Sequence, residues 1–121
     1  MIEDNVVAAF HLMWGKFPEA VMLIHKSREI LAVNEEAKKL GRTPGMKCSQ
    51  IGPPEGHRIC QANKALAEQQ AKYVKYIKAD GSGKELIGVW LPLADGSDRY
   101  VHFSIGNVIN VKIKEEEPAA W

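Results

Sequence analysis

The chain has 121 residues, of which 45% are hydrophobic, and a formal net charge of +1 at pH 7. This length allows one domain around one core, and the near-zero charge gives no electrostatic argument for nucleic acid or an anionic membrane as a partner. No apolar run approaches the roughly 20 residues of a membrane span and no signal-peptide pattern is present, so we expect a cytoplasmic protein.

Residues 4–17 show the spacing of an amphipathic helix. Its apolar face is built from large residues that recur every three or four positions: Val6, Phe10, Met13 and Phe17. Two interpretations stay open: this face packs on its own domain, or part of it meets the same helix in a second chain. We therefore assign residues 1–17 to an N-terminal helix that caps the domain or forms a dimer contact.

Two short apolar runs, at 20–24 and 30–33, predict a pair of buried strands joined by a polar hairpin turn. The second run leads through Asn34 into a short helical segment that ends at Gly41. Asparagine is a favourable helix cap, and two glutamates followed by two lysines in this segment suit the helix dipole. We expect Asn34 to organise this corner and to have no chemical role.

The second half of the chain begins with an irregular stretch at 46–60, where a Gly-Pro-Pro sequence prevents a continuous helix. Helix-forming residues return at 58–72. Three strand candidates follow, at 73–79, at 85–93 and from residue 99 onward. The two Asp-Gly-containing turns between them predict an antiparallel meander.

The last strand has the clearest periodicity. Odd-numbered residues from Val101 to Ile113 are mostly apolar and the even-numbered ones mostly polar, which predicts one face in the core and one wetter face. With the earlier pair of strands, this gives a five-stranded antiparallel sheet with helices across one face, an α+β domain.

Three segments, at 17–24, 29–41 and 95–104, resemble the PAS sensory-domain family, and the resemblance spans about residues 15–112. It implies the strand order 2-1-5-4-3, with helices that enclose a pocket over one face of the sheet. We therefore expect a PAS core at 18–114 and a flexible tail at 115–121.

Members of this family sense small ligands, haem, flavin, redox state or light, and they usually signal by changing how they pair with another domain. Large or polar-tipped residues are the candidates for the lining of the pocket: Tyr76, Trp90, Tyr100, His102 and Ser104. The alternative is that these side chains simply fill the interior. We expect no enzymatic activity, because no catalytic triad, paired acids or phosphate-binding loop is present.

Cys48, His57 and Cys60 are candidates for chemistry. His-x-x-Cys places two ligands within one helical turn, and Cys48 could approach from the preceding loop to form part of a zinc or iron site or a redox pair. Many PAS domains of bacterial sensors carry a similar loop, in which Gly-x-x-Cys is followed by a pair of cysteines. In this chain His57 stands where the first cysteine of that pair would be. The alternatives are two free thiols with a surface histidine, or a cytosolic disulfide.

The resemblance leaves the cofactor unknown. His57 lies near the place where haem-binding members hold their iron ligand, whereas covalent haem attachment is excluded because no Cys-x-x-Cys-His motif is present. Gly45 and Cys48 match the spacing of the flavin-reactive stretch of light-sensing members, but the arginine that binds the flavin phosphate is absent.

The sequence therefore predicts a bacterial, cytoplasmic signal-transduction module. We expect it to bind a small molecule in its core and to signal through a homodimer or another signalling protein, with neither nucleic acid nor a membrane as a partner. One alternative is a metal, haem or redox sensor that uses Cys48, His57 and Cys60. The other is a purely structural dimerisation module with a filled core.

Overall fold

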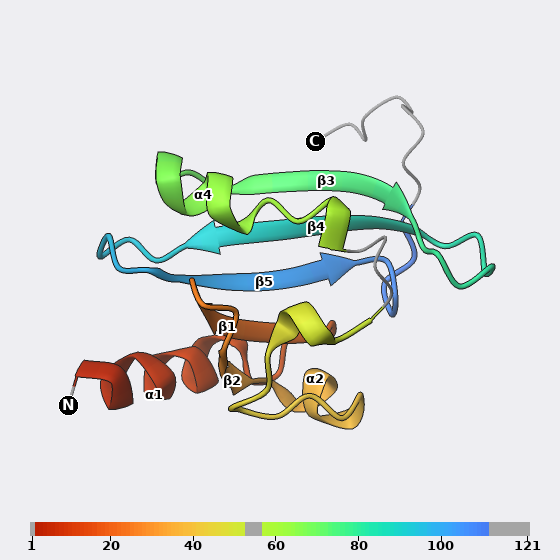
Figure 1. Ribbon diagram of the computed structural model, residues 1–121. Helices are drawn as coiled ribbons and strands as arrows, with labels where there is room; N and C mark the ends of the chain where they lie inside the picture. Colours follow the sequence, from red (N-terminus) through yellow and green to blue (C-terminus); the bar gives the residue numbers. More distant parts are fainter. Residues whose placement is uncertain (1, 53–56, 112–121) are drawn as a thin grey trace, which may run out of the picture.

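The computed structural model describes residues 2–52 and 57–111, and five strands form one antiparallel sheet (Figure 1). The strands are β1 (Val21–His25), β2 (Ile30–Val33), β3 (Lys72–Ile77), β4 (Glu85–Pro92) and β5 (Arg99–Ile105). Their spatial order is β2-β1-β5-β4-β3. This order and the α+β class confirm the expectation from the sequence.

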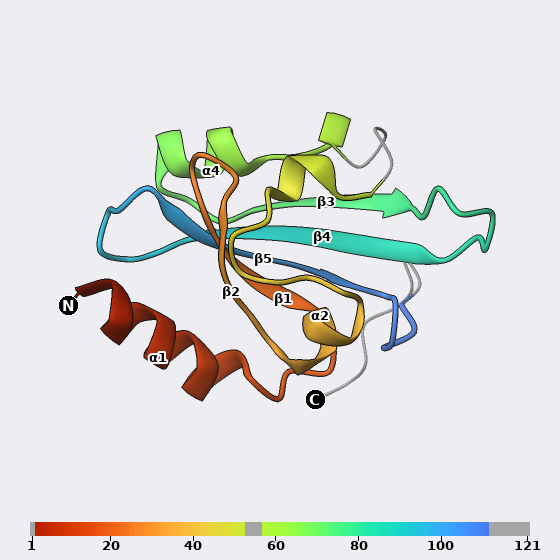
Figure 2. The same ribbon diagram turned by 60° about the horizontal axis from the view of Figure 1, so that its bottom comes forward.

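Helical segments cover both faces of the sheet. They are α1 (Ile2–Trp14), α2 (Glu35–Lys39), the 3-10 turn η1 (Cys48–Gln50) and α4 (Ala62–Glu68). One core contains residues of α2 and α4, and a second core on the opposite face contains residues of α1 (Figure 2). No helix of the described residues is long and apolar enough to cross a membrane.

The helix expected at 58–72 is shorter than the sequence pattern indicated. His57 and Arg58 belong to a separate helical turn, and α4 begins only at Ala62. It ends after Glu68 because Gln69 adopts a left-handed conformation, with φ of 51°. The chain then enters β3, whose first residue, Lys72, had been expected to lie in the helix.

Helix α1 packs on the outer face of the sheet through an aromatic cluster. The ring of Phe103 on β5 lies 5.4 Å from Trp14 and 5.5 Å from Phe17, and Phe10 is buried beside them. Met13, however, is 75% exposed, because the buried face follows the spacing from Phe10 to Trp14. The predicted apolar face thus divides between the sheet and the solvent.

The strand expected to continue from residue 99 to Ile113 ends at Ile105, and Ile113 lies outside the described residues. Gly106 has φ of 130°, and a Cβ at this position would overlap the carbonyl oxygen of Glu85. The even-numbered face of β5 is also not the wet face expected, since Tyr100 is only 1% exposed. Helices cover this face, so both sides of β5 are packed.

Glu19, which is 0% exposed, holds the segment that follows β5. Its carboxylate oxygens accept hydrogen bonds from the backbone N–H groups of Gly106 at 3.1 Å, Val108 at 3.0 Å and Ile109 at 2.8 Å. These donors replace the water that a buried carboxylate would otherwise need. The start of β1 and the end of β5 are thereby connected.

Asn34 is buried and joins three parts of the chain. Its side chain forms five hydrogen bonds: Oδ1 accepts from the N–H groups of Val21 and Ala37, and Nδ2 donates to the carbonyl groups of Trp14, Phe17 and Glu19. The bond to Ala37 caps α2, and the others connect the end of α1 to the start of β1. Asn34 therefore fixes the corner from which the helices over the cavity begin.

Asn34→Ala should lower the free energy of unfolding by about 3 kcal/mol, because buried backbone groups lose their partner. Urea denaturation followed by circular dichroism measures this change. The control is Asn110→Ala at an exposed position, which should change stability by less than about 0.5 kcal/mol. Equal effects of the two substitutions would contradict the role assigned to Asn34.

Candidate functional site

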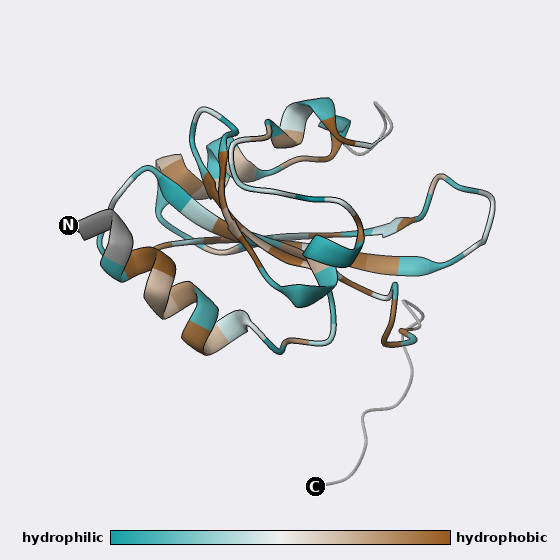
Figure 3. Cartoon of the chain, turned by 90° about the horizontal axis from the view of Figure 1, so that it is seen from below, coloured by the Kyte–Doolittle hydropathy of each residue, from teal (hydrophilic) through white to brown (hydrophobic). Residues whose placement is uncertain are grey.

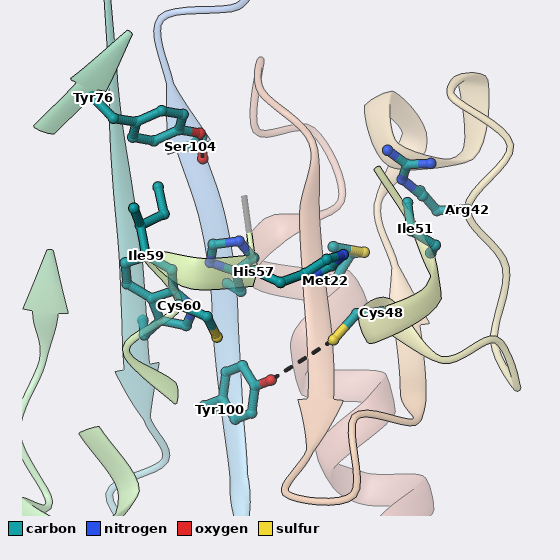
Figure 4. A pocket seen from close by; sticks show the side chains of 12 residues that line it. Met22, Arg42, Cys48, Ile51, His57, Ile59, Cys60, Tyr76, Tyr100 and Ser104 are labelled. Atoms are coloured by element: carbon teal, nitrogen blue, oxygen red, sulfur yellow. Dashed lines mark hydrogen bonds between the residues drawn. The ribbon is translucent and has the colours of Figure 1, made fainter. Parts of the chain in front are cut away.

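A cavity of about 230 Å³ lies over the helix-covered face of the sheet. Its floor comes from β3, β4 and β5, and its roof from η1 and residues 57–60 (Figure 4). All five residues predicted to line a pocket lie on its wall: Tyr76, Trp90, Tyr100, His102 and Ser104. The wall also includes Cys48, His57 and Cys60. The structure thus brings the two predicted sets of site residues around one space.

Trp90 and His102 form the centre of the floor. They are directly opposite each other on β4 and β5, and their rings stack 4.7 Å apart with an interplanar angle of 15°. Nδ1 of His102 lies 2.8 Å from the carbonyl oxygen of Val89, which fixes the orientation of the imidazole. Burial lowers the pKa of His102, and the hydrogen bond to Val89 opposes this shift.

Tyr76 and Ser104 meet across the strand that separates them. Their hydroxyl groups are 2.9 Å apart, although β4 lies between β3 and β5 (Figure 4). Gly88 on β4 makes this contact possible: a Cβ there would be 3.3 Å from Tyr76 and 3.1 Å from the ring of Trp90. A glycine inside a strand often marks such a close approach. Gly88 was not among the residues predicted from the sequence, although a glycine inside the strand expected at 85–93 is such a signal.

The thiol of Cys48 faces the hydroxyl of Tyr100 at 4.0 Å (Figure 4). Burial raises the pKa of Cys48, and the hydrogen bond with Tyr100 opposes this shift. Burial also raises the pKa of Tyr100 well above its usual value. Both groups are therefore uncharged at pH 7, and a neutral thiol is a weak nucleophile and a weak metal ligand.

Cys48, His57 and Cys60 do not form a three-ligand site. In the part of the chain that the structure describes, no group of three or more His, Cys, Asp or Glu side chains is placed to hold a metal ion. Cys48 and Cys60 are both free thiols. The cavity, at about 230 Å³, is also smaller than the roughly 300–1,000 Å³ that is typical of sites for drug-sized ligands.

The wall includes further residues that sequence reasoning did not select: Met22, Arg42, Ile51 and Ile59. Met22 lies in a continuous apolar run, where periodicity does not show which side chains face the helices. Arg42 and Ile51 come from loops that the fold of the chain brings over the sheet (Figure 4). No local signal identifies such residues, because their position depends on long-range contacts.

No sequence model of a known protein family matches the chain, and no curated protein sequence matches it. Solved structures do resemble it. They include the PAS domain of BvgS from Bordetella pertussis, with a TM-score of 0.65 and 14% identity over 84% of this chain and 86% of that one. A sensory box sensor histidine kinase from Vibrio cholerae has a TM-score of 0.60 and 15% identity, covering 85% and 93%.

A domain of an HTR-like protein from Haloarcula marismortui has a TM-score of 0.57 and 20% identity, over 74% of this chain and 98% of that one. These likenesses show the fold. The resemblance seen in the sequence is thus confirmed, and the chain has the fold of PAS sensory domains.

The stability of the protein should fall as the pH decreases below about 6.5, where histidine in the unfolded chain takes up a proton. The lowered pKa of His102 means that the folded state does not take up this proton over the same range, so protonation favours unfolding. The loss contributed by His102 should reach about 1.4 kcal/mol per pH unit at its steepest.

Chemical denaturation between pH 5 and 8 measures this dependence. In His102→Phe, which keeps a ring against Trp90, the part of the slope due to His102 should disappear. If the variant and the unmodified protein show parallel curves, the shift assigned to His102 is wrong.

Proposed function

We propose that this chain, which has the PAS fold, is a sensory module that binds a small molecule in the cavity above β4 and β5 and signals through contacts with a second protein chain. The cavity itself is the observation that supports binding. Its wall combines apolar surface with a few polar tips, which is the usual composition of a small-molecule site.

The arrangement of the wall favours a binding site over a filled core. Tyr76 pairs with Ser104, and Cys48 pairs with Tyr100, so these polar groups hold one another at the edges of the space. Gly88 removes a side chain from the middle of the floor. A larger residue at this position would reduce the space between the rings that border it.

Strand β5 offers a path from the cavity to the opposite face of the sheet. His102 and Ser104 face the cavity, whereas Phe103 between them packs against Trp14 and the end of α1. A ligand that moves β5 would therefore also change the position of α1 on the sheet. Such a ligand acts by favouring one of two pre-existing arrangements of the helix.

The outer side of α1 is the candidate surface for pairing. Leu12 is 88% exposed and Met13 is 75% exposed, and both are large apolar residues. Figure 3 shows that hydrophobic and hydrophilic residues both occur along α1. Exposed apolar groups that lie together are typical of protein contacts. Because the other side of α1 already packs on the sheet, Leu12 and Met13 can meet a second copy without loss of that packing.

A redox sensor is the second candidate. Cys48 and Cys60 line the same cavity as free thiols, so an oxidant small enough to enter reaches both. The neutral state of Cys48 argues for slow reaction, because the thiolate is the reactive form. Small-molecule binding therefore remains the favoured proposal.

A screen of small organic compounds should find ligands that raise the melting temperature of the protein. Gly88→Ala should weaken their binding about tenfold or more, because an added methyl group pushes the rings of Trp90 and Tyr76 into the cavity. Lys64→Ala is the control, because Lys64 is exposed on α4 and does not line the cavity, so it should leave ligand binding unchanged. No shift with any compound would favour the filled-core dimerisation module.

The variant Leu12→Glu/Met13→Glu should convert a dimer into a monomer, because two charges would be buried in the contact. Sedimentation velocity over a range of concentrations measures this change. Leu40→Glu, at another exposed apolar residue that follows the end of α2, should leave the dimer intact. The proposal fails if the unmodified protein is monomeric throughout, or if the double variant still forms the dimer.

A further inference from the structure

The hydrogen bond of His102 determines which of its ring nitrogens carries the proton. Nδ1 lies 2.8 Å from the carbonyl oxygen of Val89, and a carbonyl oxygen can only accept. Nδ1 must therefore be the N–H donor. Because burial favours the neutral ring, Nε2 carries a lone pair and is a hydrogen-bond acceptor.

His102 lines the cavity, and its Nδ1 is engaged by Val89, so we infer that Nε2 is the ring nitrogen turned toward the cavity. No donor for this nitrogen is found among the described residues. Every buried side-chain nitrogen or oxygen of those residues has a hydrogen-bond partner. A nitrogen without a partner, such as Nε2, is therefore not fully buried. His102 lies on the cavity wall and on the helix-covered face of β5, so the cavity is the space that reaches this atom.

The hydroxyl and thiol groups at the edges of the floor already have partners. The hydroxyl groups of Tyr76 and Ser104 bind each other, and Cys48 faces Tyr100. Nε2 thus differs from these groups, because it is an acceptor on the floor with no donor among the described residues. Arg42 contributes a cation to the wall, but it lies beside Ile51 at the far side of the view in Figure 4, away from Tyr76 and Ser104.

We propose that the cavity selects a small, uncharged, single-ring molecule that donates an O–H or N–H hydrogen bond to Nε2 of His102. This inference rests on the proposed function, because it specifies the ligand of the same cavity. The size supports one ring: a cavity of about 150 Å³ holds benzene, and this one measures about 230 Å³. The neutral thiol and hydroxyl groups around the floor would not compensate a charge at this end of the ligand.

Phenol and fluorobenzene test the donor, because they have nearly the same size and only phenol has an O–H group. In calorimetric titrations, phenol should bind the unmodified protein at least about fivefold more tightly than fluorobenzene. In His102→Phe the preference should reverse, because the phenol hydroxyl would lose its bonds to water without a replacement. Tyr73→Phe, at an exposed residue of β3 that does not line the cavity, is the control and should keep the preference for phenol.

Nuclear magnetic resonance of protein with ¹⁵N-labelled histidine tests the tautomer directly, and it does not depend on whether His102→Phe folds. At pH 7 the spectrum should show His102 as the neutral Nδ1–H form. Addition of phenol should shift the Nε2 resonance, and addition of fluorobenzene should leave it nearly unchanged. An Nε2–H tautomer, or a charged ring, would overturn the inference.

The outcomes separate this inference from the proposed function. If both probes bind equally, or if the preference for phenol persists in His102→Phe, the assigned role of His102 is wrong and the ligand cavity stands. If neither probe binds but other compounds raise the melting temperature, the ligand class is wrong and the sensory module stands. If no compound binds at all, both proposals fail.

Discussion

The side chain of Asn34 is the interaction on which the rest of the structure depends. One amide group satisfies backbone groups of the end of α1, the start of β1 and the first turn of α2. These groups are distant in sequence, and each would be costly to bury without a partner. The side chain therefore determines where α1 crosses to one face of the sheet and where the chain turns back toward the other. The cavity lies under the segments that begin at this corner.

Strand β5 connects the two faces of the domain because its side chains alternate. Odd-numbered residues such as Phe103 pack against α1, and even-numbered residues such as Tyr100 and His102 face the cavity. A strand in the centre of a sheet is held on both edges, so it resists local bending and moves with its neighbours. A change at the cavity could consequently reach the surface that carries α1. The proposed ligand site and the proposed pairing surface would then communicate through β5, although the sheet separates them.

The sequence predicted the elements well where the pattern was local. Alternation located the start of β5, and the resemblance supplied the strand order. Prediction failed where distant contacts decide. Glu19 looked like an ordinary charged residue, but its donors lie 87 to 90 positions away. The end of β5 depends on the backbone at Gly106, where there is no room for a side chain. The exposure of Met13 depends on how α1 is rotated against the sheet. The pocket residues on the strands were predictable because they are large or polar-tipped, whereas the Tyr76–Ser104 contact across Gly88 was not.

The contact between Glu19 and the segment after β5 has a consequence for evolution. The carboxylate binds only main-chain N–H groups, so apart from Gly106, where a Cβ would overlap Glu85, it holds this segment without any contact that depends on the side chains. Val108 and Ile109 are accordingly free to point outward, with 60% and 41% exposure. Substitutions at these two positions can alter what the surface contacts while the path of the backbone stays the same. The domain can thus acquire new partners at this edge without any change in its own architecture.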